Sequence, residues 1–356
     1  MTSPPNWRRA GEALVRQARE RYRQRNLRDY EEGTRRSAAA RARKHGPDDV
    51  DSLLLRRKHA VALRSLGRFA EAEAEYTDLI RSMTATVGPG HLHTINTRAQ
   101  RAAALRDLAR FSEAEAELRE LVAAAAAGNV GTAPLRLWHA VALQDLGRFE
   151  ESEAELRQLL EAQTRLHGPE SSATLVARMN LALAVGELGR AAEAEAELAA
   201  ASSGLATARG HLHRDTLIAR VQHALAVRRL GRAAEAESEL DRAIKGLSAT
   251  IGPHHMDTLR ARAWHGVLLH DLGRLEEARP ELGAAVDELT RIMGADHPYT
   301  LRHRWHLARL LRDLGHEDEA RAMRDAALRS VDSVLGADHP VTREIRSQGD
   351  DHARPG

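Results

Sequence analysis

The turn sequence Leu-Gly, mostly followed by Arg, recurs at a nearly constant spacing, and this recurrence constrains the fold more than any other feature. Its glycines are Gly67, Gly147, Gly189, Gly231, Gly273 and Gly315, and Ala109 takes the glycine position once. Consecutive markers lie 42 residues apart, except for one interval of 38 before Gly147. A fixed period of this length is the signature of a repeat architecture. The sequence therefore predicts a tandem array of units rather than one globular core.

Each repeat contains two stretches that are typical of α-helices. Residues 174–189 carry apolar side chains at helical spacing among helix formers, Gly189-Arg190 forms a tight turn, and residues 192–207 form the second stretch. We expect the hydroxyl residue that opens each first helix, such as Thr174, to cap that helix. A small residue recurs at the place where the paired helices are expected to cross. In the first helix these residues are Ala60, Ala102, Ala140, Ala182, Ala224, Gly266 and Ala308.

The repeats divide the chain into three parts. Residues 46–341 hold seven repeats, one of them shortened to 38 residues. Residues 1–45 read as a degenerate leading repeat or N-terminal cap, with 13 Arg and Lys against 5 Asp and Glu. Residues 342–356 are predicted to form a partial capping helix and a disordered tail. Repeat arrays need such polar ends because an uncapped array would stack without limit.

Two short motifs carry a family resemblance. One is Met179-Asn180-Leu181-Ala182, and the other is the loop Gly294-Ala295-Asp296-His297-Pro298-Tyr299-Thr300, which is echoed at 336–342. With the period and the small positions, they resemble the tetratricopeptide repeat of the 42-residue, kinesin-light-chain-like variety, in a bacterial-looking form. The resemblance covers residues 46–345. It implies an all-α, right-handed superhelical solenoid of helix-turn-helix repeats, with the first helices lining the concave face.

No catalytic, metal or cofactor site is expected. The chain has no Cys, which excludes disulfides and thiolate chemistry, and it lacks phosphate-loop and metalloprotease motifs. The histidine pairs His91/His93 and His211/His213 have a spacing that metal sites use. Successive loops lie along one edge of a solenoid, however, so we interpret these pairs as loop variants. A second set of histidines precedes the small positions, and packing explains it better than proton transfer: His59, His139, His223 and His265.

The concave face is the predicted binding surface. The resemblance places certain positions of each first helix there, and these supply an apolar floor, two tryptophans treated as exposed anchors, and a margin of arginines. The candidates are Arg64, Arg106, Trp138, Val141, Met179, Asn180, Leu183, Gln222, Leu225, Arg228, Trp264, Val267, His270, Trp305, His306, Arg309 and Arg312. An alternative is that some apolar members pack against the next hairpin, and that the arginines pair with nearby aspartates such as Asp145 and Asp271.

These patterns favour a non-enzymatic scaffold or adaptor that binds a protein or peptide with apolar anchors and acidic residues. Two alternatives remain: a peptide-sensing regulator, and nucleic-acid binding through the basic residues 1–45. Nucleic acid is disfavoured as a partner of the groove because the rest of the chain carries a net negative charge. No stretch approaches the roughly 20 apolar residues of a membrane span, and no signal peptide is recognisable, so we expect a cytoplasmic protein with no membrane partner. The sequence leaves the oligomeric state open.

Overall fold

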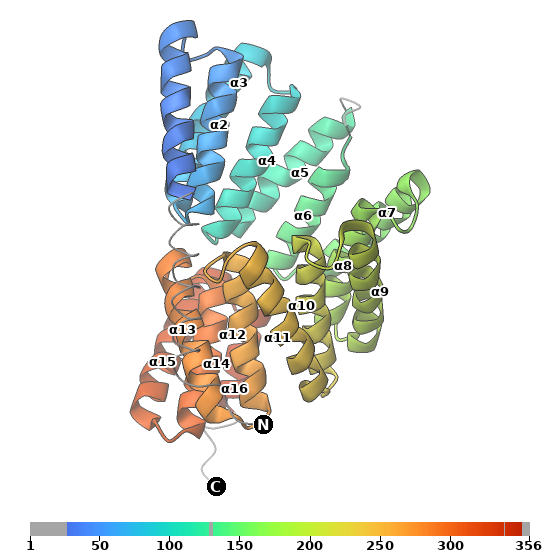
Figure 1. Ribbon diagram of the computed structural model, residues 1–356, viewed down its shortest axis with the longest axis vertical. Coiled ribbons are helices and arrows are strands. Elements are labelled where there is room, and N and C mark those ends of the chain that lie inside the picture. Colours follow the sequence, from blue (N-terminus) through green and yellow to red (C-terminus); the bar gives the residue numbers. More distant parts are fainter. Residues whose placement is uncertain (1–26, 128–130, 338, 351–356) are drawn as a thin grey trace. The chain divides into compact units, whose positions relative to one another are not determined.

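The computed structural model describes residues 27–127, 131–337 and 339–350, and over these it is helical without a strand (Figure 1). Most of the predicted N-terminal cap, residues 1–26, and the predicted disordered tail, residues 351–356, lie outside the described residues. A helix over residues 27–45 precedes the labelled elements. These are α2 (Val50–Ser65), α3 (Phe69–Val87), α4 (Leu92–Asp107), α5 (Phe111–Ala127), α6 (Ala133–Asp145), α7 (Phe149–His167), α8 (Ser172–Glu187), α9 (Ala191–Arg209), α10 (Arg214–Arg229), α11 (Ala233–Thr250), α12 (Met256–Asp271), α13 (Leu275–Met293), α14 (Pro298–Asp313), α15 (Glu317–Leu335) and α16 (Pro340–Asp350).

The helices form two compact units. Unit 1 contains the described residues up to Leu105 together with Gly252–His254, and unit 2 contains the described residues from Arg106 onward apart from that short loop. In unit 2, a first helix (even-numbered) packs against the second helix of its own repeat and against the second helix of the repeat before, and in unit 1 α2 packs against α3. In unit 2 the first helices α6, α8, α10, α12, α14 and α16 also contact one another in sequence, so they form an inner layer. The predicted all-α repeat solenoid is confirmed.

The loops between repeats use histidine as a helix cap. The Nδ1 atoms of His213, His255, His297 and His339 each accept a hydrogen bond from the backbone N–H two residues further on, at 3.1 to 3.2 Å. Such bonds satisfy N–H groups that have no partner inside the helix. The hydroxyl of Thr174 instead donates to the carbonyl of Gly168 at 2.8 Å. Thr94 and Thr216 make the same bond to Gly88 and Gly210. At these three positions the expectation that the hydroxyl caps the first helix is therefore wrong, because it bonds to the preceding glycine turn.

The small positions lie where the two helices of a hairpin cross most closely. Ala60, Ala102, Ala140 and Ala182 are each 0 % exposed. Gly266 on α12 faces α13 so closely that a Cβ atom would lie 2.6 Å from Leu282 Cβ and 2.8 Å from the Leu282 backbone nitrogen. Backbone atoms cannot move aside by a side-chain rotation. A larger residue at position 266 would therefore push α12 and α13 apart.

Gly266→Ala is expected to destabilise unit 2 by about 1–3 kcal/mol, the usual cost of overpacking. Gly283→Ala on α13 is the matched control, since a Cβ atom added there would have no heavy atom within 4 Å. The control should stabilise the protein by about 0.5–1 kcal/mol through helix propensity. Urea unfolding of both variants measures the difference, and equal midpoints would show that the hairpin is not closely packed at this crossing.

Candidate peptide-binding cavity

The inner layer of unit 2 surrounds a cavity of about 440 Å³. Most of its wall comes from α6, α8, α10, α12 and α14, and residues of α5, α7 and α9, the end of α4 and the start of α16 complete it. A cavity of this size falls within the usual range for small-ligand sites. The repeat period explains the convergence, because equivalent faces of successive first helices turn toward the same space.

One part of the wall is apolar. Val141, Leu183, Ile218 and Leu225 come from three successive first helices, and Trp264 follows on α12. Trp264 is half-buried and rests on His303 and His306, with ring centroids 5.0 and 5.5 Å away. A half-buried indole beside branched aliphatic side chains is the kind of surface on which an apolar side chain of a ligand gains binding energy.

Most of the charges in the wall are paired. Arg214 binds Asp257 at 2.6 Å, and Arg229 binds Glu187. Arg106 binds the carboxylate of Asp145. Burial lowers the pKa of Arg106, but the Asp145 carboxylate more than offsets this effect and holds the pKa above its ordinary value. These pairs shape the wall and leave little net charge for a ligand.

Arg260 differs from these arginines. Its guanidinium lies 3.9 Å from the centre of the Tyr299 ring, and it has no ion pair or hydrogen bond with any described residue. Arg302, further along the wall, is held by Glu344 at 3.1 Å. The side chain of Gln222 also faces the cavity without a hydrogen bond to the described part of the chain. The cavity therefore offers one uncompensated cation and one free amide beside an apolar wall.

Eight of the sequence candidates line this cavity. They are Arg106, Val141, Met179, Asn180, Leu183, Gln222, Leu225 and Trp264. The structure adds Arg260, Tyr299 and Ile218, which the sequence reasoning missed. Arg260 precedes Trp264 by four residues on α12, and residues four apart share a helix face. That spacing could have identified Arg260.

The other candidates lie elsewhere. Trp305 and His306 are each 2 % exposed and Val267 is 1 % exposed, so their prediction as groove residues is wrong. Trp305 packs against residues of α15 and α16, and Val267 packs inside the α12–α13 hairpin. Arg64 lies in unit 1. The remaining candidates are half-buried outside the cavity wall: Trp138, Arg228, His270, Arg309 and Arg312.

The predicted arginine margin is largely a ladder of ion pairs between neighbouring repeats. Arg228 binds Asp271 at 2.6 Å, and His270, the equivalent residue one repeat later, binds Asp313 at 2.8 Å. Arg312 also contacts Asp313. The alternative interpretation, that these side chains pair with nearby aspartates, holds for them. The contacts of Arg228 with Asp271 and of His270 with Asp313 join successive first helices.

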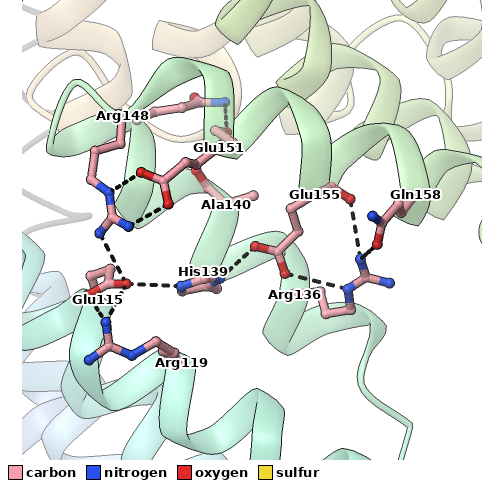
Figure 2. A network of polar contacts seen from close by, with 11 residues as sticks. Glu115, Arg119, Arg136, His139, Ala140, Arg148, Glu151, Glu155 and Gln158 are labelled. Carbon is pink, nitrogen blue, oxygen red and sulfur yellow. Dashed lines mark hydrogen bonds and ion pairs between the residues drawn. The ribbon is translucent and has the colours of Figure 1, made fainter.

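The second set of histidines occupies a polar network between repeats. His139 contacts Glu155 on α7 at 2.6 Å and Glu115 on α5 at 3.2 Å, and Arg148 reaches Glu115 at 3.4 Å (Figure 2). Burial lowers the pKa of His139, but hydrogen bonds to the two glutamates more than offset it and raise the pKa above its ordinary value. His223 repeats this arrangement with Glu239 and Glu195. Apolar packing alone therefore does not explain these histidines, since they tie one hairpin to the next.

No group of three or more potential metal ligands converges within the described residues. In the same part of the chain, no helix is long and apolar enough to cross a bilayer.

Comparisons with known proteins identify the repeat. The family model described as tetratricopeptide repeat matches residues 132–205 and 259–328. No curated protein matches the sequence significantly.

Three solved structures illustrate the likeness. The Rap protein complexed with Competence and Sporulation Factor has a TM-score of 0.62 at 15 % identity, covering 96 % of this chain and 95 % of that one. The APC/C hetero-tetramer Cut9-Hcn1 has a TM-score of 0.58 at 15 % identity, covering 90 % and 54 %. A kinesin light chain from Podosopora anserina with TPR-like repeats has 22 % identity and a TM-score of 0.44, covering 56 % and 93 %. The resemblance stated from the sequence is confirmed, and residues 132–205 and 259–328 consist of tetratricopeptide repeats.

Proposed function

We propose that the chain is a peptide- or protein-binding scaffold whose cavity in unit 2 holds a ligand segment with an apolar side chain and a carboxylate. The observation that carries the proposal is the unpaired guanidinium of Arg260 beside the apolar wall that ends at Trp264. Arginine recognises carboxylates through paired N–H donors, and an apolar side chain gains energy by leaving water in such a pocket.

The fold supports this role. The similar Rap protein was solved with Competence and Sporulation Factor bound, so a helical array of this kind holds a partner in at least one relative. We propose a non-enzymatic adaptor acting in the cytoplasm. Sensing of a peptide is the second candidate, favoured by a hydrogen bond of 3.1 Å in the cavity wall between the His339 ring, next to α16, and the Asp145 carbonyl on α6. Nucleic-acid binding has no comparable support in the described residues.

Selection from a random peptide library tests the proposal. The wild-type protein should enrich peptides that combine a bulky apolar residue with Asp, Glu or a free C-terminus. Arg260→Ala should lose the acidic preference and keep the apolar one, because it removes the cation and leaves the wall intact.

Arg165→Ala is the control. Arg165 is exposed on α7, pairs with Glu161 and does not line the cavity. It should enrich the same peptides as the wild type. Enrichment of the same acidic peptides by Arg260→Ala, or no enrichment by the wild type, would contradict the proposed function.

A further inference from the structure

The start of α16 touches the turn between α6 and α7, although these segments are far apart in the sequence. The Nδ1 atom of His339 accepts the N–H of Val341, so the proton of the neutral ring lies on Nε2. That Nε2–H donates to the backbone carbonyl of Asp145 at 3.1 Å, across 194 residues of sequence. This hydrogen bond thus joins the start of α16 to the end of α6 in the third repeat.

Gly147 shows how close the two segments are. Its φ is 73°, and a Cβ atom there would lie 2.5 Å from Pro340 Cδ and 3.7 Å from His339 Cδ2. Gly273 occupies the equivalent turn between α12 and α13 with a φ of 72°, and nothing lies within 4 Å of its Cβ position. Both turns have a positive φ, which favours glycine although Ala109 adopts a φ of 58° at the equivalent turn. Only at the α6–α7 turn would an added Cβ atom also collide with another segment.

The contact also completes the cavity. His339, Pro340 and Val341 belong to its wall, as does Asp145, whose carboxylate holds Arg106. Opening the contact would therefore remove one side of the wall and expose Arg106 and the apolar residues behind it.

We propose that His339 and Pro340, seated on Asp145 and Gly147, form a latch whose opening widens the cavity and speeds the entry of a ligand. The inference rests on the proposed function, because it names how access to the same site is controlled. The latch suits this role because it is small. Between the two segments, the described residues show one hydrogen bond and one proline–glycine contact, whereas the hairpins are held together by clusters of buried side chains. A separate contact one repeat earlier places the His297 ring 6.2 Å from the Phe111 ring.

The first test measures the latch directly. Because the chain has no Cys, cysteines at the exposed positions Glu150 on α7 and Arg343 on α16 can carry a unique pair of spin labels. Pulsed electron paramagnetic resonance should give one narrow distance in the otherwise unchanged protein. Gly147→Ala should shift and broaden it, since the added methyl collides with Pro340. Gly273→Ala introduces the same backbone strain elsewhere and should leave the distance unchanged.

The second test measures entry. Anilinonaphthalene sulfonate, an apolar dye with one negative charge, matches the apolar wall and Arg260, and its fluorescence reports binding in a stopped-flow experiment. Gly147→Ala should raise its association rate by about tenfold, as expected when a contact of hydrogen-bond strength is lost from the closed state. Gly273→Ala should match the wild type. If Gly147→Ala folds poorly, Pro340→Ala, which keeps the His339 cap, should show the same two changes.

The outcomes separate the latch from the function it controls. An identical spin-label distance in Gly147→Ala and Gly273→Ala would overturn the latch, even if the peptide selection succeeds. A shifted distance with equal association rates would overturn its control of entry. Failure of the dye to bind any variant would count against both the cavity as a binding site and the gating that depends on it.

Discussion

Trp305→Ala is expected to lower the free energy of unfolding of unit 2 by about 3–5 kcal/mol, the usual cost of truncating a buried aromatic. Trp305 is 2 % exposed and packs against Leu301, Val331, Val341 and Ile345, so its removal leaves a void between α14, α15 and α16. Denaturant unfolding followed by circular dichroism measures the loss. A change below about 1 kcal/mol would show that the indole is not part of the core.

Trp264→Ala should behave in the opposite way. Its indole is half-buried and faces the cavity, so a peptide recovered by selection should bind with about 2 kcal/mol less free energy. The melting temperature should fall less than in Trp305→Ala. A variant that melts far lower and binds as the wild type does would assign Trp264 to the core and not to the site.

Acid should destabilise unit 2 between about pH 6.5 and pH 4 through its buried histidines. Burial lowers the pKa of His303 to about 4, although the Tyr299 carbonyl opposes the shift, and burial together with the nearby His303 lowers the pKa of His306. As the pH falls through 6.5, these two histidines take up protons in the unfolded chain but stay neutral in the folded state. The stabilisation is therefore complete above pH 6.5 and is lost as the pH falls toward 4. For His303 alone it amounts to about 3 kcal/mol.

Two other histidines, His139 and His223, change the free energy of unfolding in the same pH range in the opposite direction. Hydrogen bonds to glutamates raise the pKa of His139 and His223, so protonation of these two residues stabilises the folded state as the pH falls. A variant isolates the effect of His303. His303→Leu should flatten the loss of stability between pH 6.5 and 4, and His167→Leu, an exposed position on α7, should not. Parallel pH profiles for the wild type and His303→Leu would contradict the assignment.

The fold could be predicted from the sequence because the same pattern of residues recurs in every repeat. The period, the glycine turns and the small residues at the helix crossings depend on contacts within one hairpin or between neighbours. Gly266 against Leu282 is such a contact, and the sequence shows it as a small residue at a fixed place in the repeat.

The site was only partly predictable because it depends on contacts that the repeat does not encode. Trp305 occupies a concave position by analogy, but α16 packs over the last repeat and buries it. The sequence predicts that Arg228 is a cation of the groove, but in the structure Arg228 forms an ion pair with Asp271 of the next repeat. The hydrogen bond from His339 to Asp145 joins non-adjacent repeats, so the residue pattern within one repeat does not predict it.

The proposed function depends above all on Arg260 binding a carboxylate of a ligand that is held against the wall of the cavity. A double-mutant cycle by titration calorimetry tests this most directly, with Arg260→Ala on the protein and replacement of the acidic residue by its amide on the selected peptide. We predict that each single change weakens binding by at least about tenfold and that the second change then adds almost nothing, a coupling of about 1–3 kcal/mol. Independent, additive losses would contradict the claim and place the carboxylate away from Arg260.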